Sequence, residues 1–243
     1  MSFLNEIKQR FVEHLRNEGV SLNEVAEVIS SRPLTPEEAI GRPERDDFPL
    51  LKGKEFMIEA RFRGCSGQAF TDMPRSFTAT LGEILSLSTD RNDHRAILIA
   101  SLNAVMRYLN RIEKTIHCRD EEPRLCAERL VEYVWTRFGN PRIAFIGLQP
   151  AMVSALAKHF RLRVTDLDPE NVGQVKGGVK IEDVSATREV LEWSDVVLAT
   201  GTTAVNDTLS SIVGSEKPVV FYGVTISSIA YLAGLERFCP FGH

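Results

Sequence analysis

Apolar residues at helical spacing open the chain. A first helix is predicted by Leu4, Ile7, Phe11 and Leu15, with Gly19 ending it. Apolar faces over 98–112 and 130–138 predict two further helices. The second of these stops at the tripeptide 139–141 (Gly-Asn-Pro), which we interpret as the boundary between domains 1–139 and 140–243.

Strand-like patterns separate the first helix from the other two. Residues 25–29 and 55–62 are rich in apolar residues at strand spacing, and both segments are predicted strands. Residues 31–54 are rich in proline, glycine and charge, which predicts an exposed loop. Two glycines and a closing proline predict a second, irregular loop over 64–74, which we expect to approach a ligand closely.

Beyond residue 141 the pattern becomes a regular alternation of strands and helices. Strands are predicted at 142–147, 161–168, 181–184, 196–200 and 218–223. Helices are predicted at 150–159, 185–193, 204–213 and 227–235. Five short strands that alternate with helices predict an α/β fold with a doubly wound, mostly parallel sheet.

Composition narrows the class of protein. The 243 residues are 43% hydrophobic and 26% charged, with a net charge of −4, as in an ordinary globular protein. Neither part has the basic excess of a nucleic-acid binder, and no apolar run is long enough to span a membrane. The N-terminal residues do not have the pattern of a signal peptide, so we expect a cytoplasmic protein.

The candidate ligand site follows from the topology of the predicted sheet. In doubly wound sheets, ligands bind beyond the carboxyl ends of the strands, where the first and fourth strands are neighbours. The loops that would meet there contain Gly147, then Thr200, Gly201, Thr202 and Thr203, and finally Gly223 and Thr225. We expect the backbone N–H groups of Thr202 and Thr203 to point into a pocket at a helix N-terminus, where an anion would be favoured. The alternative is that these threonines only cap their helix.

A dinucleotide site is the second interpretation of this region. Asp166 ends the second strand, about where an acidic residue often binds a ribose hydroxyl. The glycine fingerprint is absent, because Gln149 and Pro150 follow Gly147 in place of the later glycines. We therefore expect no standard NAD site.

Soft metal ligands are the third interpretation. His117 and Cys118 are adjacent, and Cys126 follows eight residues later, which offers an imidazole and two thiols to a soft divalent metal of the zinc or nickel class. The spacing fits no standard zinc motif, and Cys65 or Cys239 would complete a site only if the fold brings them close. The alternative is a buried structural role for these residues.

Several of these segments carry a family resemblance. They are residues 64–74 (with Thr71 and Asp72), 102–104, 115–126, 200–208 (with Asn206) and 222–225. Through them the chain resembles the "putative heavy-metal chelation" domain family, over most of its length from about residue 60. The resemblance implies a small α+β domain like the N-terminal domain of enolase, a Rossmann-like domain after it, and a pocket between the two. Where the family pattern leads us to expect a Gly-Pro-Ser/Thr turn, this chain has Gly223, Val224 and Thr225.

Three functions remain open at this point. The leading one is binding of a small anionic ligand or a heavy-metal chelate in a cleft between the domains, with residues 64–74 as its lid. The alternatives are an enzyme acting on a nucleotide-like or carboxylate substrate in the same cleft, and a structural or partner-binding protein. The expected partner is a small molecule or metal chelate, without nucleic acid or membrane; a homodimer is left open.

Overall fold

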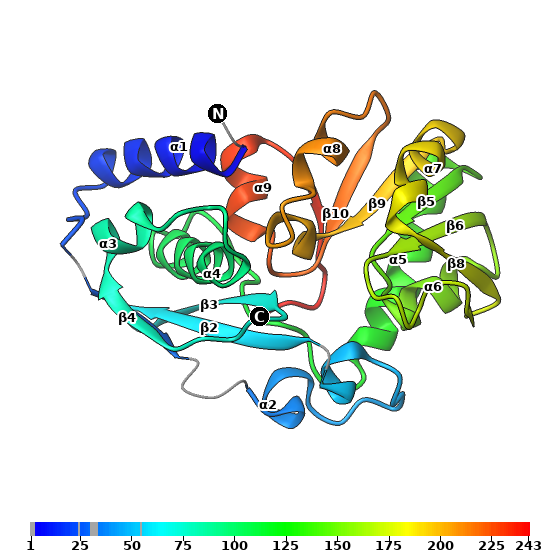
Figure 1. The fold of residues 1–243 in the computed structure, drawn as a ribbon, viewed down its shortest axis with the longest axis horizontal. Helices are drawn as coiled ribbons and strands as arrows, with labels where there is room; N and C mark the ends of the chain where they lie inside the picture. The colour runs from blue at the N-terminus through cyan, green and yellow to red at the C-terminus, as the bar shows by residue number, and fades with distance from the viewer. Residues whose placement is uncertain (1–2, 24, 30–33, 54) are drawn as a thin grey trace.

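The computed structural model describes residues 3–23, 25–29, 34–53 and 55–243. It describes the side chains of all of these except 25–29. Within them the chain forms two β-sheets, one of four strands and one of seven, with helices packed on both (Figure 1). The four-stranded sheet comes from the first part of the chain and the seven-stranded sheet from the second. The mixed α/β class and the mostly parallel sheet expected from the sequence are confirmed.

The four-stranded sheet is antiparallel, in the order β3-β2-β1-β4. Its strands are β1 (Val25–Ile29), β2 (Phe56–Phe62), β3 (Cys65–Thr71) and β4 (Phe77–Thr80). The accompanying helices are α1 (Phe3–Asn17), α3 (Leu81–Ser86) and α4 (Asn92–Tyr108). Because α4 is apolar on nearly every face, it is buried along most of its length and packs against β2 and β3.

The expectation of an irregular loop over 64–74 is wrong for most of that segment. Residues 65–71 are strand β3, joined to β2 by the tight turn at Arg63 and Gly64. Gly67 lies inside β3, where a Cβ atom would come within 2.2 Å of the Ala104 nitrogen on α4. This glycine therefore allows a helix and a strand to approach closely, which its sequence context does not distinguish from a loop glycine.

The expectation of an exposed loop over 31–54 is also incomplete. Residues 31–33 and 54 lie outside the described residues. The remainder contains helix α2 (Pro36–Ile40), which a capping box at Thr35 begins, and the short 3-10 helix η1 (Pro49–Lys52). Ile40 and Leu50 on these helices are buried, because the segment covers the lower edge of the molecule beneath α5.

The second sheet has the strand order β11-β10-β9-β5-β6-β8-β7. Its strands are β5 (Arg142–Ile146), β6 (Arg161–Asp166), β7 (Val175–Lys176), β8 (Val179–Asp183), β9 (Val196–Thr200), β10 (Val219–Tyr222) and β11 (Glu236–Phe238). The helices beside it are α5 (Glu122–Phe138), α6 (Pro150–Leu156), α7 (Thr187–Trp193), α8 (Leu209–Val213) and α9 (Ser227–Ala233), with the 3-10 turns η2 (Val184–Ala186) and η3 (Gly201–Ala204).

The strand order agrees with the expectation that the first and fourth predicted strands are neighbours, on which the predicted position of the site depends. The five predicted strands are β5, β6, β8, β9 and β10, and the first and fourth of them, β5 and β9, are paired in parallel. Two short edge strands, β7 and β11, were not predicted; β7 is antiparallel to β8. The helix predicted over 204–213 is interrupted, because η3 ends at Ala204 and α8 begins only at Leu209.

Asn103 on α4 joins the two sheets. Its fully buried side chain donates from Nδ2 to the carbonyl oxygens of Gln68 (3.0 Å), Val224 (3.2 Å) and Thr225 (3.2 Å). Its Oδ1 atom accepts from the backbone nitrogen of Ser228 at 2.8 Å. One amide therefore fixes β3 against the loop between β10 and α9.

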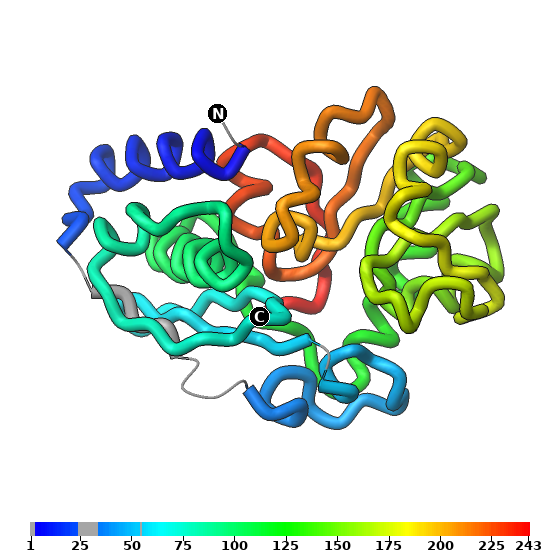
Figure 2. Tube along the Cα trace, viewed as in Figure 1, coloured from blue at the N-terminus to red at the C-terminus, as the bar shows by residue number. Residues whose placement is uncertain are grey.

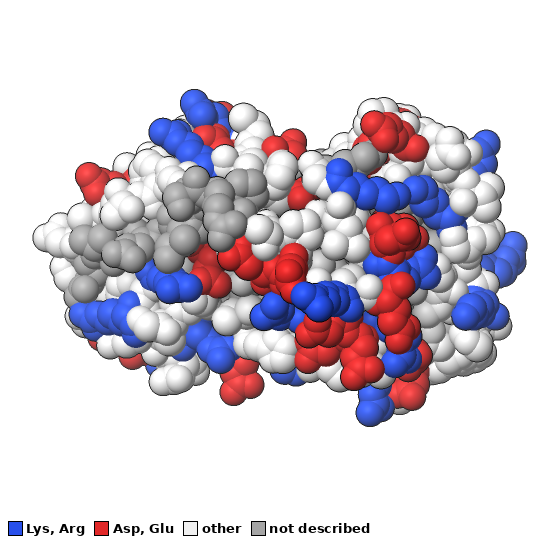
Figure 3. Space-filling model, turned by 90° about the horizontal axis from the view of Figure 1, so that it is seen from below, with Lys and Arg blue, Asp and Glu red and all other residues white. Residues whose placement is uncertain are grey.

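The outer surface carries charges of both signs. On the face seen in Figure 3, acidic and basic side chains lie next to one another near its centre and on its right side. Among the described residues, no helix has the length and apolarity needed to cross a membrane.

Candidate functional site

A pocket of about 660 Å³ lies where the carboxyl ends of β5, β6, β9 and β10 face the end of β3. Its volume falls in the range of small-molecule and cofactor sites. All fourteen residues that the sequence suggested as ligand-binding or metal-binding line it: Thr71, Asp72, His117, Cys118, Cys126, Gly147, Asp166, Thr200, Gly201, Thr202, Thr203, Asn206, Gly223 and Thr225. The fold thus brings all of them together at one cavity.

Gly147 shapes the floor of the pocket. It follows β5 with φ +84°, and a Cβ atom there would lie 2.5 Å from Cγ2 of Thr200 at the end of β9. The Gly147 carbonyl accepts a hydrogen bond from the Tyr222 hydroxyl at 2.7 Å. Only a residue without a side chain lets the ends of β5, β9 and β10 meet this closely.

The turn from Thr200 to Thr203 differs from the expected helix start. It forms the 3-10 helix η3, and the Thr202 N–H donates to Oγ1 of Thr200 at 3.3 Å instead of being free for a ligand. The Thr203 hydroxyl donates back to the Thr200 carbonyl at 2.7 Å. The capping alternative raised from the sequence therefore describes much of this turn.

Three further backbone donors near the floor are also engaged within the protein. Gln149 Oε1 accepts from the Met152 nitrogen at the start of α6 at 2.5 Å, and Pro150 has no N–H to offer. Asp166 accepts from the Leu148 nitrogen at 2.7 Å and from the Asp168 nitrogen at 2.9 Å. Asp166 thus organises two pocket loops.

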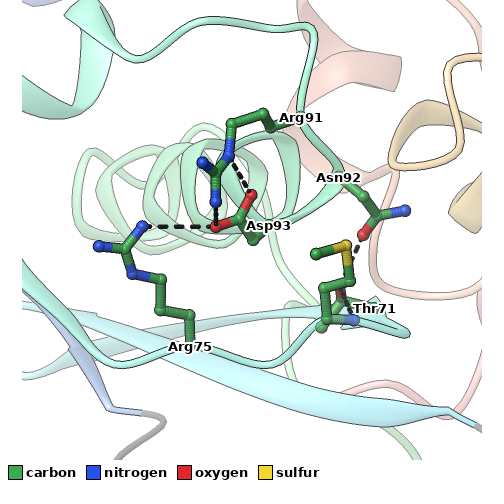
Figure 4. A network of polar contacts seen from close by, with 6 residues as sticks. Thr71, Arg75, Arg91, Asn92 and Asp93 are labelled. Carbon is green, nitrogen blue, oxygen red and sulfur yellow. Dashed lines mark hydrogen bonds and ion pairs between the residues drawn. The ribbon is translucent and has the colours of Figure 1, made fainter.

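A chain of side-chain hydrogen bonds closes the side of the pocket next to β3. The Thr71 hydroxyl donates to Oδ1 of Asn92 at 2.8 Å, and Nδ2 of Asn92 donates to Oδ1 of Asn206 at 3.2 Å. Figure 4 shows Thr71 below Asn92 at the start of α4, with the pair Arg91 and Asp93 beside them. These bonds connect the end of β3 to the loop between η3 and α8.

Asp93 holds the start of α4 in place. It is buried and accepts from Arg91 at 2.8 and 3.0 Å and from Arg75 at 3.4 Å (Figure 4). The hydrogen bond with Arg91 lowers the pKa of Asp93 to about 2. Asn92 is therefore presented to Thr71 from a fixed helix end.

The predicted metal ligands lie on the irregular segment before α5 and on α5 itself. The backbone N–H of His117 donates to Oε1 of Gln68 at 2.8 Å, and its ring lies edge-on to Phe70. Burial lowers the pKa of His117 to about 4, so its imidazole is neutral at pH 7. Its buried Nδ1 atom has no hydrogen-bond partner among the described residues.

The two predicted sulfur ligands are thiols in an apolar setting. Burial raises the pKa of Cys126 to about 12 and that of Cys118 well above its usual value. Among the residues that the structure describes, no three His, Cys, Asp or Glu side chains are arranged to hold a metal ion. The side chains of His117, Cys118 and Cys126 thus share a pocket wall without forming a complete coordination sphere.

Sequence reasoning missed two features of the pocket and raised a third, Cys239, only on the condition that the fold brings it close. Cys239, which follows β11, contributes a third thiol to the lining, and Phe48, Phe238 and Phe241 add an aromatic wall. Glu55, just before β2, lines the cavity as well, and burial, followed by the charges of Asp166, Asp72 and Asp168, raises its pKa to about 7. These residues come from segments distant in sequence, and no local motif marks them.

The sign of the charge in the pocket is uniform. Among the described residues, the charged side chains of the lining are all acidic: Glu55, Asp72, Asp166, Asp168 and Glu170. No lysine or arginine lines the cavity in that part of the chain. Because low-dielectric walls strengthen the field of these carboxylates, the cavity favours a ligand that carries positive charge.

Comparisons with known proteins agree with the resemblance expected from the sequence. Residues 130–235 match the model of the DUF364 family, described as "Putative heavy-metal chelation". The crystal structure of a protein of unknown function from that family, from Pyrococcus horikoshii, is similar to this chain with a TM-score of 0.57 and 16% identity. The match covers 92% of this chain and 79% of that protein. With 16% sequence identity, this structural similarity establishes that the two proteins share a fold.

A second member of that family, from Desulfitobacterium hafniense DCB-2, has a TM-score of 0.49 and 14% identity, covering 74% of this chain and 73% of its own. No curated protein shows significant similarity to the chain. The match to the family model confirms the resemblance to the "Putative heavy-metal chelation" family over residues 130–235, and the family description supports a binding role in general terms.

Proposed function

Given the match to a heavy-metal chelation family, we propose that this protein binds a positively charged metal chelate in the pocket between its two sheets. The observation that carries the proposal is the composition of the lining. Apolar walls, carboxylates as the charged groups, and a neutral imidazole beside thiols surround one cavity.

The size of the cavity supports a chelate over a bare ion. A volume of about 660 Å³ is far larger than a metal ion needs and matches a ligand of drug-like size. The described residues also hold no set of three ligands for an ion. A small molecule that supplies most of the coordination sphere would need only one or two donors from the protein.

His117 and Cys118 are the protein donors that we propose for the metal, with Cys126 as a third. A neutral imidazole with an unpartnered nitrogen atom is a good ligand for zinc or nickel. The lone pair is available without loss of a proton at pH 7, because the pKa of His117 is about 4. A buried thiol would lose its proton when the metal binds, which makes the affinity dependent on pH.

The carboxylates of the pocket lining would favour the cationic member of any pair of chelates. The backbone donors that would attract an anion are engaged within the protein at Leu148, Met152 and Thr202. The same floor carries Asp166 and Asp168, whose charges oppose an anion. We therefore favour a cationic chelate over an anionic ligand.

Two nickel complexes of equal denticity and different charge provide the test. The 1:1 complex with terpyridine has a charge of +2 and that with pyridine-2,6-dicarboxylate a charge of 0, and both chelators are tridentate, so calorimetry with both varies the charge while the open metal positions stay the same. We expect the terpyridine complex to bind at least tenfold more tightly. His117→Ala should weaken it, whereas His159→Ala, a histidine outside the pocket lining, should not. Equal affinity for both complexes, or binding that His117→Ala leaves unchanged, would contradict the proposal.

A further inference from the structure

Two aromatic residues lie side by side in the pocket, at the ends of neighbouring strands. Tyr222 is the last residue of β10 and Phe238 is the last residue of β11, and the two residues are partners in the parallel register of these strands. Paired residues of adjacent strands project from the same face of a sheet, with their backbones about 4.8 Å apart. Both side chains line the cavity. The second sheet therefore presents two adjacent rings to the cavity, which we name the aromatic platform.

Other side chains hold the aromatic platform from outside the cavity. The ring of Phe145 stacks on that of Tyr222, with centroids 5.1 Å apart and 24° between the ring planes. The ring of Tyr133 on α5 packs against that of Phe238 with centroids 5.0 Å apart. Phe145 and Tyr133 are both outside the cavity lining. The hydroxyl of Tyr222 is also fixed by its hydrogen bond to Gly147, so the platform is oriented before a ligand binds.

Two more rings reach the cavity from other parts of the chain. Phe70 comes from β3 of the first sheet, and its ring lies edge-on to the His117 imidazole with centroids 5.3 Å apart. Phe241 lies in the C-terminal segment, which is attached where Ile116 and His243 exchange two backbone hydrogen bonds of 2.9 Å. Figure 2 shows this red end of the chain beside the segment that leads into α5. Rings thus border the cavity from both sheets, and one of them contacts the histidine proposed as a metal donor.

We propose that the chelating molecule is a flat heteroaromatic nitrogen ligand that lies against the aromatic platform. Aromatic rings in offset-stacked or edge-to-face contact gain about 0.5–1.5 kcal/mol per pair beyond the burial of apolar area. A cation held among the ring atoms of the chelator is also attracted to the faces of Phe and Tyr rings. An aliphatic chelate of the same charge has no ring to stack. The inference rests on the proposed chelate function and adds the chemical class of the chelator.

Two nickel complexes of equal charge and denticity test the chemical class. Terpyridine is flat and aromatic, whereas pentamethyldiethylenetriamine is aliphatic and not flat. Both are neutral tridentate chelators with an apolar surface, so each 1:1 complex has a charge of +2. We expect calorimetry to show that the parent protein binds the terpyridine complex at least tenfold more tightly than the aliphatic one.

The outcomes separate this inference from the function on which it rests. If the two complexes bind with equal affinity and His117→Ala weakens both, the chelate function stands and the aromatic class is refuted. Tighter binding of the aliphatic complex would refute it as well. If neither complex binds, the chelate function and this inference both fail. The comparison uses the parent protein alone, so it decides the question even if a variant does not fold.

The aromatic platform is tested by removing one of its rings. Phe238→Leu keeps an apolar side chain, and it should weaken the terpyridine complex at least fivefold while the affinity for the aliphatic complex stays unchanged. Phe160→Leu is the matched control, because Phe160 belongs to the same hydrophobic cluster and its ring packs against Trp135 on α5, yet it is outside the lining of this pocket. The control should bind both complexes like the parent. Equal weakening of both complexes by Phe238→Leu, or no weakening of either, would contradict stacking on the platform.

Discussion

The amide of Asn103 provides the sharpest test of how the two sheets are held around the pocket. Asn103→Asp keeps the size of the side chain and the oxygen that accepts from the Ser228 nitrogen. It removes the Nδ2 donor that faces the carbonyls of Gln68, Val224 and Thr225. A buried carboxylate oxygen would then face three carbonyl oxygens, so the change replaces hydrogen bonds with repulsion while the packing stays nearly the same.

The magnitude follows from the bonds lost. The two N–H groups of the amide contribute about 1 kcal/mol each, and leaving buried carbonyls without their donor costs roughly another 2 kcal/mol. We therefore expect a loss of about 4 kcal/mol in the free energy of unfolding at pH 7, or about 8 °C in Tm for a chain of this size. The loss should shrink as pH falls below 7, because burial against carbonyl oxygens raises the pKa of the aspartate and its protonation restores one donor.

Thermal unfolding followed by circular dichroism at pH 4.5 and pH 7 measures both effects. Ser101→Ala is the matched control on the same helix, since the Ser101 hydroxyl is buried and has no hydrogen-bond partner among the described residues. That variant should differ from the parent by less than about 1 kcal/mol. A Tm for Asn103→Asp within 2 °C of the parent at pH 7, or a gap that does not shrink in acid, would refute the reasoning.

Three further predictions concern the pocket and its frame. Because the folded-state pKa of Glu55 is raised to about 7, the parent should lose stability relative to Glu55→Gln as pH rises from 4.5 to 7. Affinity for nickel terpyridine should rise more steeply with pH around 7 in the parent than in Glu55→Gln, and a pH titration of both proteins checks this. Gly147→Ala should lower the free energy of unfolding by about 1–3 kcal/mol and abolish chelate binding. Adding Thr200→Ser to that variant removes Cγ2 of residue 200 and should recover part of the stability, measured by urea unfolding. No recovery would show that backbone strain alone is responsible. Gly67→Ala should destabilise the protein far more than Gly64→Ala. Both glycines lie on the same hairpin, but only at Gly67 would a Cβ atom clash with backbone atoms of α4. Equal urea midpoints for the two variants would exclude that contact as the cause.

The sequence predicted the parallel sheet well because its central strands are buried on both faces. Runs such as 143–146 and 196–199 are continuously apolar, and their alternation with helices leaves few arrangements open. The prediction of secondary structure failed where the local composition favours one structure and tertiary contacts impose another. Gly67 resembles a loop residue but is required by the approach of α4 to β3, and the edge strands β7 and β11 have only two and three residues.

The site was predictable to the extent that it depends on topology. Once β5 and β9 are neighbours, the loops after them must share an edge of the sheet, so Gly147 and Thr200 meet whatever their detailed conformation. Cys239 and Glu55 could not be found in this way, because each reaches the pocket through contacts between segments far apart in sequence. Ile116 with His243 is one such contact, and no local pattern predicts it.

The charge preference of the ligand shows where reasoning from sequence reaches its physical limit. A threonine-rich turn at a strand end predicts exposed N–H groups, and exposed N–H groups predict an anion. The same residue types also satisfy those groups themselves: Thr200 accepts from Thr202, and Asp166 accepts from Leu148. Once the donors are satisfied internally, the ionised carboxylates dominate the field in the cavity. Whether a polar side chain bonds to a ligand or to its own backbone depends on a side-chain rotation that moves its polar atom by a few ångströms, and composition and spacing do not encode that rotation. Here this choice changes the expected ligand from an anion to a cation.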